Sequence, residues 1–144
     1  YPDEYMLKFD FHGVKLEFFR ASTPLQKQII LNAKSSKYLD ATLSMLDFWS
    51  IAKLKLIALL SREKSRDLYD FKIILEKNVL TEQEVLDILL ETKPNLKTLK
   101  ELYSFIENLE MTNDDETVYL DEENPVNLTF EEIKVDTLTM IKKF

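Results

Sequence analysis

The chain has no cysteine, and it has one glycine and one histidine among its 144 residues. Without cysteine, disulfides and thiolate metal sites are excluded, and a reducing compartment is favoured. A single glycine excludes the glycine-rich phosphate loops of P-loop and dinucleotide-binding proteins, and a single histidine excludes a zinc site built from several histidines. No apolar run approaches the roughly 18 residues of a membrane span. We therefore expect a cytoplasmic protein with no membrane partner.

Positive charge is scarce in the second half of the chain. Residues 1–77 carry 13 Lys or Arg against 10 Asp or Glu, a net charge of +3, whereas residues 78–144 carry 6 Lys against 16 acids, a net charge of −10. The overall composition therefore lacks the basic footprint of a nucleic-acid-binding domain. The acidic half is expected to be a solvated surface. Its densest stretch, residues 110–123, is alternatively a docking patch for a basic protein partner.

Two alternating runs around the single glycine predict a β-hairpin from Leu7 to Phe18. The pair His12-Gly13 suits a two-residue type I′ turn, which needs positive φ. In this register one face is entirely apolar, because Phe11, Phe9 and Leu7 lie opposite Val14, Leu16 and Phe18. The other face joins residues of opposite charge, Asp10 with Lys15 and Lys8 with Glu17. Since an isolated hairpin is marginal in water, the apolar face should pack on a larger sheet or a helix.

Helical periodicity and capping signals dominate from Asp47 onward. The expected helices are 47–60, 66–77, one capped by Thr81 and Glu84, one carrying Leu96 to Leu109, and one from Thr129 to Phe144. Earlier in the chain, the pattern predicts a short helix at 23–30, a loop at 34–37 and a strand at 41–45. We also expect a weak capping box of Ser44 with Asp47, and a core position for Trp49. The fold class is therefore α+β, with a β-rich part at 1–46 and a bundle of four or five helices at 47–144.

The richest cluster of charges lies between Ala52 and Asp70. If residues 52–75 form one helix or two nearly coaxial helices, the spacings of 7, 4 and 4 place Lys55, Arg62, Arg66 and Asp70 along one stripe, with Asp67 one turn away. Cations followed by carboxylates suit a triphosphate, because Lys and Arg hold phosphate oxygens and carboxylates orient those cations or bind magnesium. The alternative is a pair of helices joined by structural Arg–Asp bridges, which also place charged residues close together.

The same stretch resembles the C-terminal motif of the AbiEii/AbiGii toxin family of nucleotidyltransferases. In that family a helix of the form Ala-x-Lys-Leu-x-Ala-Leu-x-x-Arg runs into Arg/Lys-Asp-x-x-Asp-Leu. Here the lysine of the motif falls on Lys55, or on Lys53 if the register slips, and the two aspartates fall on Asp67 and Asp70. The match is close over about twenty residues and looser over most of the chain.

The resemblance implies a nucleotide transfer from a nucleoside triphosphate to an RNA, such as tRNA, or to a protein acceptor. It implies that Lys55, Asp67 and Asp70 are catalytic, that Arg62 and Arg66 bind the substrate, and that Mg²⁺ is the cofactor. The strand containing Glu17 resembles one that can carry a metal-binding carboxylate. Glu17 is alternatively a cross-strand partner of Lys8. The family further implies a toxin of a toxin–antitoxin or phage-defence pair, with a protein antitoxin as a possible partner.

One part of the family pattern is absent from this sequence. Gly-Ser followed by Asp-x-Asp, which supplies the metal-binding carboxylates of the family, does not occur, and Gly13 precedes Val14 rather than serine. The chain also begins at Tyr1. We therefore expect the C-terminal part of an enzyme that is inactive without its first half. The alternative is a non-catalytic helical module that binds another protein.

Overall fold

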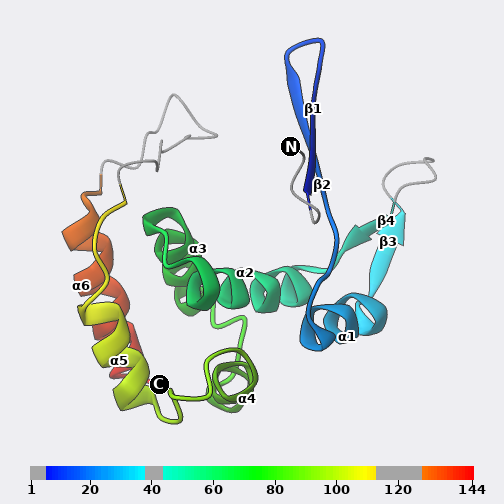
Figure 1. Ribbon diagram of the computed structural model, residues 1–144. Helices are drawn as coiled ribbons and strands as arrows, with labels where there is room; N and C mark the ends of the chain where they lie inside the picture. The colour runs from blue at the N-terminus through cyan, green and yellow to red at the C-terminus, as the bar shows by residue number, and fades with distance from the viewer. Residues whose placement is uncertain (1–5, 38–43, 113–127) are drawn as a thin grey trace. The chain divides into compact units, whose positions relative to one another are not determined.

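A computed structural model describes residues 6–37, 44–112 and 128–144 (Figure 1). The chain divides into two compact units, residues 1–46 and residues 47–144. The first unit contains short strands and a helix, and the described secondary-structure elements of the second are all helices. The predicted α+β class is therefore confirmed. None of the described helices combines the length and the apolarity needed to span a membrane.

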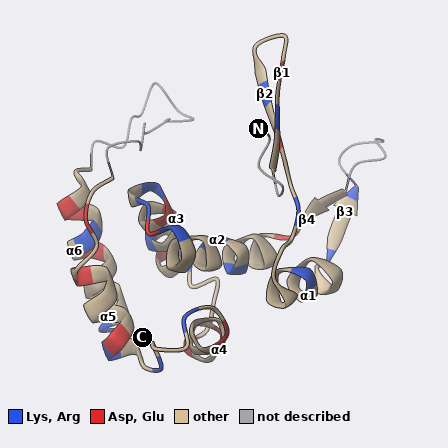
Figure 2. Ribbon diagram, viewed as in Figure 1, with Lys and Arg blue, Asp and Glu red and all other residues tan. Residues whose placement is uncertain are grey.

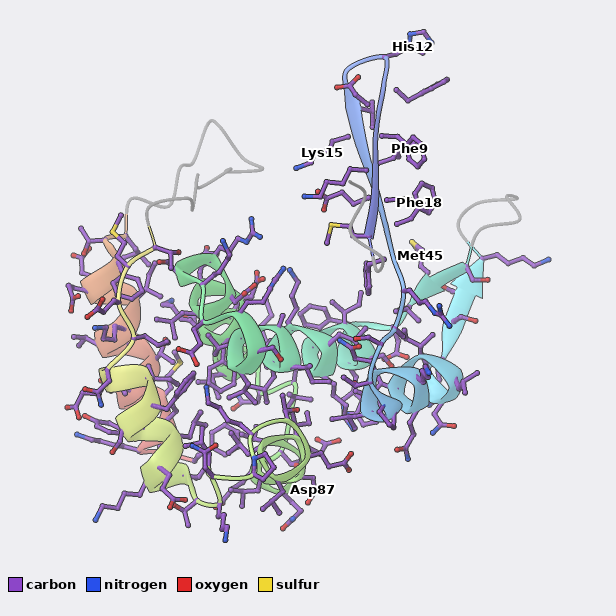
Figure 3. All side chains as sticks on the ribbon, viewed as in Figure 1. Phe9, His12, Lys15, Phe18, Met45 and Asp87 are labelled. Carbon is purple, nitrogen blue, oxygen red and sulfur yellow. The ribbon has the colours of Figure 1, made fainter. Side chains whose placement is uncertain are left out.

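The hairpin of the first unit has the predicted register. Strand β1 (Met6–Phe11) pairs with strand β2 (Val14–Phe19) in antiparallel fashion, with Phe9 opposite Leu16 and Lys8 opposite Glu17. His12 and Gly13 form the turn with φ of 52° and 81°, as a type I′ turn requires. Phe9 and Phe18 project to one side of the hairpin and Lys15 to the other (Figure 3). The six residues of the apolar face remain between 41% and 63% exposed.

The remainder of the first unit departs from the prediction in detail. Helix α1 (Pro24–Asn32) begins after Thr23, whose side chain forms a capping box with Gln26. Strands β3 (Ser35–Lys37) and β4 (Ser44–Leu46) pair antiparallel. The predicted loop at 34–37 is therefore wrong, because residues 35–37 pair with a second strand. The predicted strand at 41–45 begins at Ser44 among the described residues, and positions 41–43 lie outside them.

Five helices form the described part of the second unit, in agreement with the predicted bundle of four or five. They are α2 (Phe48–Arg62), α3 (Ser65–Glu76), α4 (Glu82–Thr92), α5 (Leu99–Glu107) and α6 (Phe130–Ile141). Helix α3 packs against α2 and α6, α4 packs against α2, and α5 packs against α6. The least exposed large side chains come from four of the five helices: Leu56, Leu59, Leu68, Phe71, Leu89, Leu102 and Ile106. Burial of these apolar side chains is the main favourable contribution to the free energy of forming the bundle.

In the second unit, side-chain caps mark the starts of α2, α4, α5 and α6, whereas α3 begins without one. The predicted boxes Thr81–Glu84 and Thr129–Glu132 are confirmed, and Thr98 forms a third box with Glu101. The predicted box of Ser44 with Asp47 is wrong, since Asp47 is itself the N-cap of α2. Its carboxylate accepts hydrogen bonds from the backbone N–H of Ser50 at 2.9 Å and from the hydroxyl of Ser50 at 3.0 Å.

These caps predict a pH dependence of folding. The backbone N–H of Lys97 and the hydroxyl of Thr98 hold the pKa of Glu101 below its ordinary value, and the backbone N–H and hydroxyl of Thr129 do the same for Glu132. A carboxylate with a lowered pKa in the folded state stabilises the fold above its ordinary pKa of 4.5 and loses this contribution as the pH falls through the lower folded value.

The double variant E101Q/E132Q should therefore unfold more readily than wild type at pH 7, and this difference should shrink as the pH falls below 4.5. The measurement is chemical denaturation followed by circular dichroism at several pH values. The matched control is E91Q/E107Q, which removes two exposed carboxylates from the last turns of α4 and α5, outside the caps. An equal pH dependence in the two double variants would contradict the prediction.

Candidate functional site

The predicted charged residues lie around the turn between α2 and α3. Helix α2 ends at Arg62, Glu63 follows with a left-handed φ of 56°, and α3 begins at Ser65. The two helices then pack side by side instead of continuing along one axis. Along a single straight helix, Lys55 and Asp70 would be separated by about 22 Å, whereas the ammonium of Lys55 lies 2.7 Å from a carboxylate oxygen of Asp70. The predicted single stripe is therefore wrong.

Arg62 and Asp67 form a two-point ion pair across this turn. Nε of Arg62 donates to Oδ2 of Asp67 at 3.1 Å, and an NH₂ group of Arg62 donates to Oδ1 at 2.6 Å. The side chain of Asp67 is only 1% exposed, whereas that of Arg62 is 42% exposed. Both oxygens of Asp67 are therefore engaged, and the carboxylate holds the guanidinium in a fixed orientation at the edge of the bundle.

Lys55 and Asp70 form the second ion pair between these helices, and it is more accessible to solvent. The side chain of Lys55 is 46% exposed and that of Asp70 is 34% exposed. Arg66 lies one turn before Asp70 on α3 and is also exposed. Basic and acidic residues are mixed along α3 (Figure 2). The packing of α2 on α3 thus brings these four charged residues together as two separate ion pairs, Lys55 with Asp70 and Arg62 with Asp67.

Lys53, the alternative if the family register slips, belongs to another cluster. Its ammonium lies 3.3 Å from Glu84 of α4 and 3.4 Å from the ring centroid of Trp49. The indole N–H of Trp49 also donates to Glu84, at 2.8 Å. Trp49 is 41% exposed, so its predicted place in the core is wrong. With its ammonium in contact with both Glu84 and Trp49, Lys53 joins α2 to α4 and is less available to a ligand than Lys55.

Lys72, a buried lysine of α3, is not among the residues that the sequence patterns singled out. Its side chain is 7% exposed and pairs with Glu76 on the same helix, and its ammonium lies 3.9 Å from Asp136 of α6. A recognisable signal was its position between Phe71 and Ile74, inside the apolar stretch of α3. Lys72 is almost fully buried and connects α3 to α6.

Glu17, the proposed metal-binding carboxylate, lies in the hairpin of the first unit. Its carboxylate is 3.1 Å from the ammonium of Lys15 and 3.6 Å from that of Lys8. The hydrogen bond from Lys15 and the charges of both lysines lower the pKa of Glu17. The cross-strand pairing with Lys8, which the sequence offered as the alternative, is thus present, and the role of Glu17 as a metal ligand stays a prediction.

The described residues contain no preformed cluster for the magnesium expected from the family. Mg²⁺ in a nucleotide-transfer site is held by carboxylate oxygens together with substrate phosphates. Within the described ranges, no group of three or more His, Cys, Asp or Glu side chains is placed to hold a metal ion. Asp67, Asp70 and Glu17 each lie against a basic side chain instead. No step of a reaction can therefore be assigned to a metal held by these residues.

Comparison with known proteins identifies the family. Residues 3–135 match the family model described as nucleotidyl transferase AbiEii toxin, Type IV TA system. No curated protein and no solved structure gave a significant match. The family match covers nearly the whole chain and includes both units. The resemblance seen in the sequence is therefore confirmed, and this chain belongs to the AbiEii nucleotidyl transferase toxin family of type IV toxin–antitoxin systems.

Proposed function

We propose that this chain supplies the nucleotide-holding helices of a nucleotidyltransferase toxin that transfers a nucleotide from a nucleoside triphosphate to a hydroxyl group of an RNA acceptor. Family membership over residues 3–135 supports the reaction class. The half-exposed ion pair of Lys55 with Asp70 is the observation that carries the assignment to α2 and α3. Ion pairs in purely structural roles are common on protein surfaces, so the test must separate the two roles.

In this proposal, the ammonium of Lys55 binds phosphate oxygens of the triphosphate, and Asp70 keeps it directed toward them. Arg62 contacts the triphosphate or the RNA backbone with the part of its guanidinium that faces solvent, while buried Asp67 holds it in place. Arg66, which is exposed on α3 next to Asp67, adds a second guanidinium. Guanidinium and ammonium groups suit this role, because they donate charge-assisted hydrogen bonds to phosphate oxygens.

The proposed reaction is a displacement at the α-phosphorus. The acceptor oxygen forms a bond to the α-phosphorus, and the bond between the α-phosphorus and the oxygen that bridges it to the β-phosphorus breaks. Pyrophosphate leaves, and the proton of the acceptor hydroxyl passes to solvent. Negative charge develops on the phosphoryl and leaving-group oxygens, so fixed cations nearby stabilise the transition state. Divalent metal, the cofactor expected for the family, would add to this stabilisation, and its ligands are not assigned to the described residues.

Calorimetric titration of the full chain with each of the four ribonucleoside triphosphates tests the proposal, with and without Mg²⁺. We expect binding of at least one triphosphate, weakened about tenfold in K55A because one charged contact to phosphate is lost, which is worth about 1.4 kcal/mol. The matched control is K53A, two residues away on the same helix but engaged with Glu84 and Trp49. Equal weakening in both variants would contradict the assignment to Lys55.

A second candidate function is a helical module that binds another protein without chemistry. It is favoured by the pairing of every proposed site carboxylate with a cation, which is also the arrangement of a purely structural network. The same titration separates the two functions. Absence of triphosphate binding by the intact chain, with the fold verified by circular dichroism, would favour the interaction module over the nucleotide site.

A further inference from the structure

A small apolar pocket lies between α5 and α6, away from the α2–α3 ion pairs. It has a volume of about 300 Å³ and is lined by Leu99, Lys100, Tyr103, Ile141 and Lys142. The C-terminal end of α6 thus meets the first turn of α5 (Figure 1). This volume is at the lower end of the range for ligand pockets. It is large enough for an apolar side chain and small for an extended ligand.

The charged side chains that line this pocket are both basic, although the second half of the chain is acidic. Residues 78–144 carry only 6 Lys against 16 acids, yet two of those lysines, Lys100 and Lys142, line the pocket. Both are exposed, and neither forms an ion pair with a carboxylate in the part of the chain that the structure describes. The ammonium of Lys142 instead lies 4.9 Å from the ring centroid of Tyr103. Two cations therefore lie beside an open, largely apolar pocket, and neither is held by a carboxylate among the described residues.

The pocket shares no residue with the proposed nucleotide-holding helices. Leu99, Lys100 and Tyr103 lie within the family match, and Ile141 and Lys142 lie beyond residue 135, where the match ends. The proposed nucleotide-holding residues lie on α2 and α3, and none of them lines the pocket. A ligand at this position would therefore contact none of the proposed nucleotide-holding residues.

We propose that this pocket binds an acidic segment of a partner protein, with one apolar side chain inserted in the cavity and flanking carboxylates held by Lys100 and Lys142. Apolar walls favour an aliphatic or aromatic anchor, because a nucleobase would need polar groups to bind its edges. Most of the binding energy of such contacts comes from a few buried anchor residues. The lysines contribute charge complementarity, which favours acidic sequences and weakens as salt screens it.

The test uses four fluorescein-labelled nine-residue peptides, each with a central Leu, Ile, Phe or Trp flanked by Asp and Glu. Fluorescence anisotropy with the full chain should detect binding of at least one peptide, weaker at high salt. In K100Q/K142Q we expect about tenfold weaker binding. The matched control K77Q/K143Q removes the same charge from exposed lysines that do not line the pocket, and should bind as wild type. L99W, which fills the cavity, should also abolish binding.

Four results would overturn the proposal. Absence of binding by all four peptides would show that the pocket does not accept such a segment. Equal loss of peptide binding in K100Q/K142Q and K77Q/K143Q would show only non-specific charge attraction. Full binding of a fifth, control peptide with serine at its centre would show the same. Displacement of the peptide by a ribonucleoside triphosphate, lost in K100Q/K142Q but retained in K55A, would instead assign the pocket to a nucleotide.

Discussion

Replacement of Arg62 by glutamine should lower the free energy of unfolding by about 3–5 kcal/mol, because it leaves the buried carboxylate of Asp67 without its cation. Asp67 is 1% exposed and both its oxygens accept from Arg62, so water cannot readily replace the guanidinium. The reverse change, D67N, should cost less, about 1–3 kcal/mol. It leaves the half-exposed guanidinium of Arg62, which can be solvated where it stands. The measurement is urea denaturation at pH 7 monitored by circular dichroism.

The asymmetry between the two variants is the informative result. A control at Lys77, an exposed lysine at the end of α3, should change stability by no more than about 0.5 kcal/mol when replaced by glutamine. If R62Q and D67N destabilised the chain equally, the burial of Asp67 would not govern the energetics of the turn. If R62Q cost no more than K77Q, the pair would behave as an ordinary surface ion pair.

The hairpin and the helix starts could be predicted from sequence because each depends on local rules. Alternation and opposite charges fix the register of Lys8 with Glu17, and a threonine three residues before Glu84 or Glu132 forms a capping box. Strand β3 escaped prediction because Ser35 and Ser36 show no apolar period, and its pairing with β4 depends on residues further along the chain. Three-residue strands leave too short a pattern for periodicity to detect.

The geometry of the candidate site depends on one backbone conformation that composition does not reveal. Glu63 adopts a left-handed φ, which is uncommon outside glycine, so the sequence predicts a break but not the reversal that follows. Once α3 folds back on α2, Lys55 meets Asp70, and Arg62 meets Asp67. The family motif therefore pointed to these candidate residues, while their pairing was decided by the packing of the two helices.

Exchange of the two charges of the exposed pair, K55D/D70K, should abolish triphosphate binding by the chain, with a loss of about 100-fold or more, equivalent to about 2.7 kcal/mol. In the proposed site the cation at position 55 meets the phosphates, so the exchanged variant presents a carboxylate to an anion. The exchanged pair can still form an ion pair between α2 and α3. Because an exposed pair of this kind contributes about 0–1 kcal/mol, the variant should remain folded.

This exchange separates a functional pair from a structural one more sharply than single replacements do. A structural pair is indifferent to which helix carries the cation, so stability would be lost in K55D and D70K alone and recovered in the double variant, with triphosphate binding unchanged throughout. A functional Lys55 gives the same recovery of stability, but triphosphate binding is lost and the double variant does not regain it. The two readouts, thermal denaturation and calorimetric titration, are made on the same preparations, so loss of binding in a variant of normal melting temperature cannot be attributed to unfolding. Recovery of binding in K55D/D70K would remove Lys55 from the proposed site and leave the pair as a connection between α2 and α3.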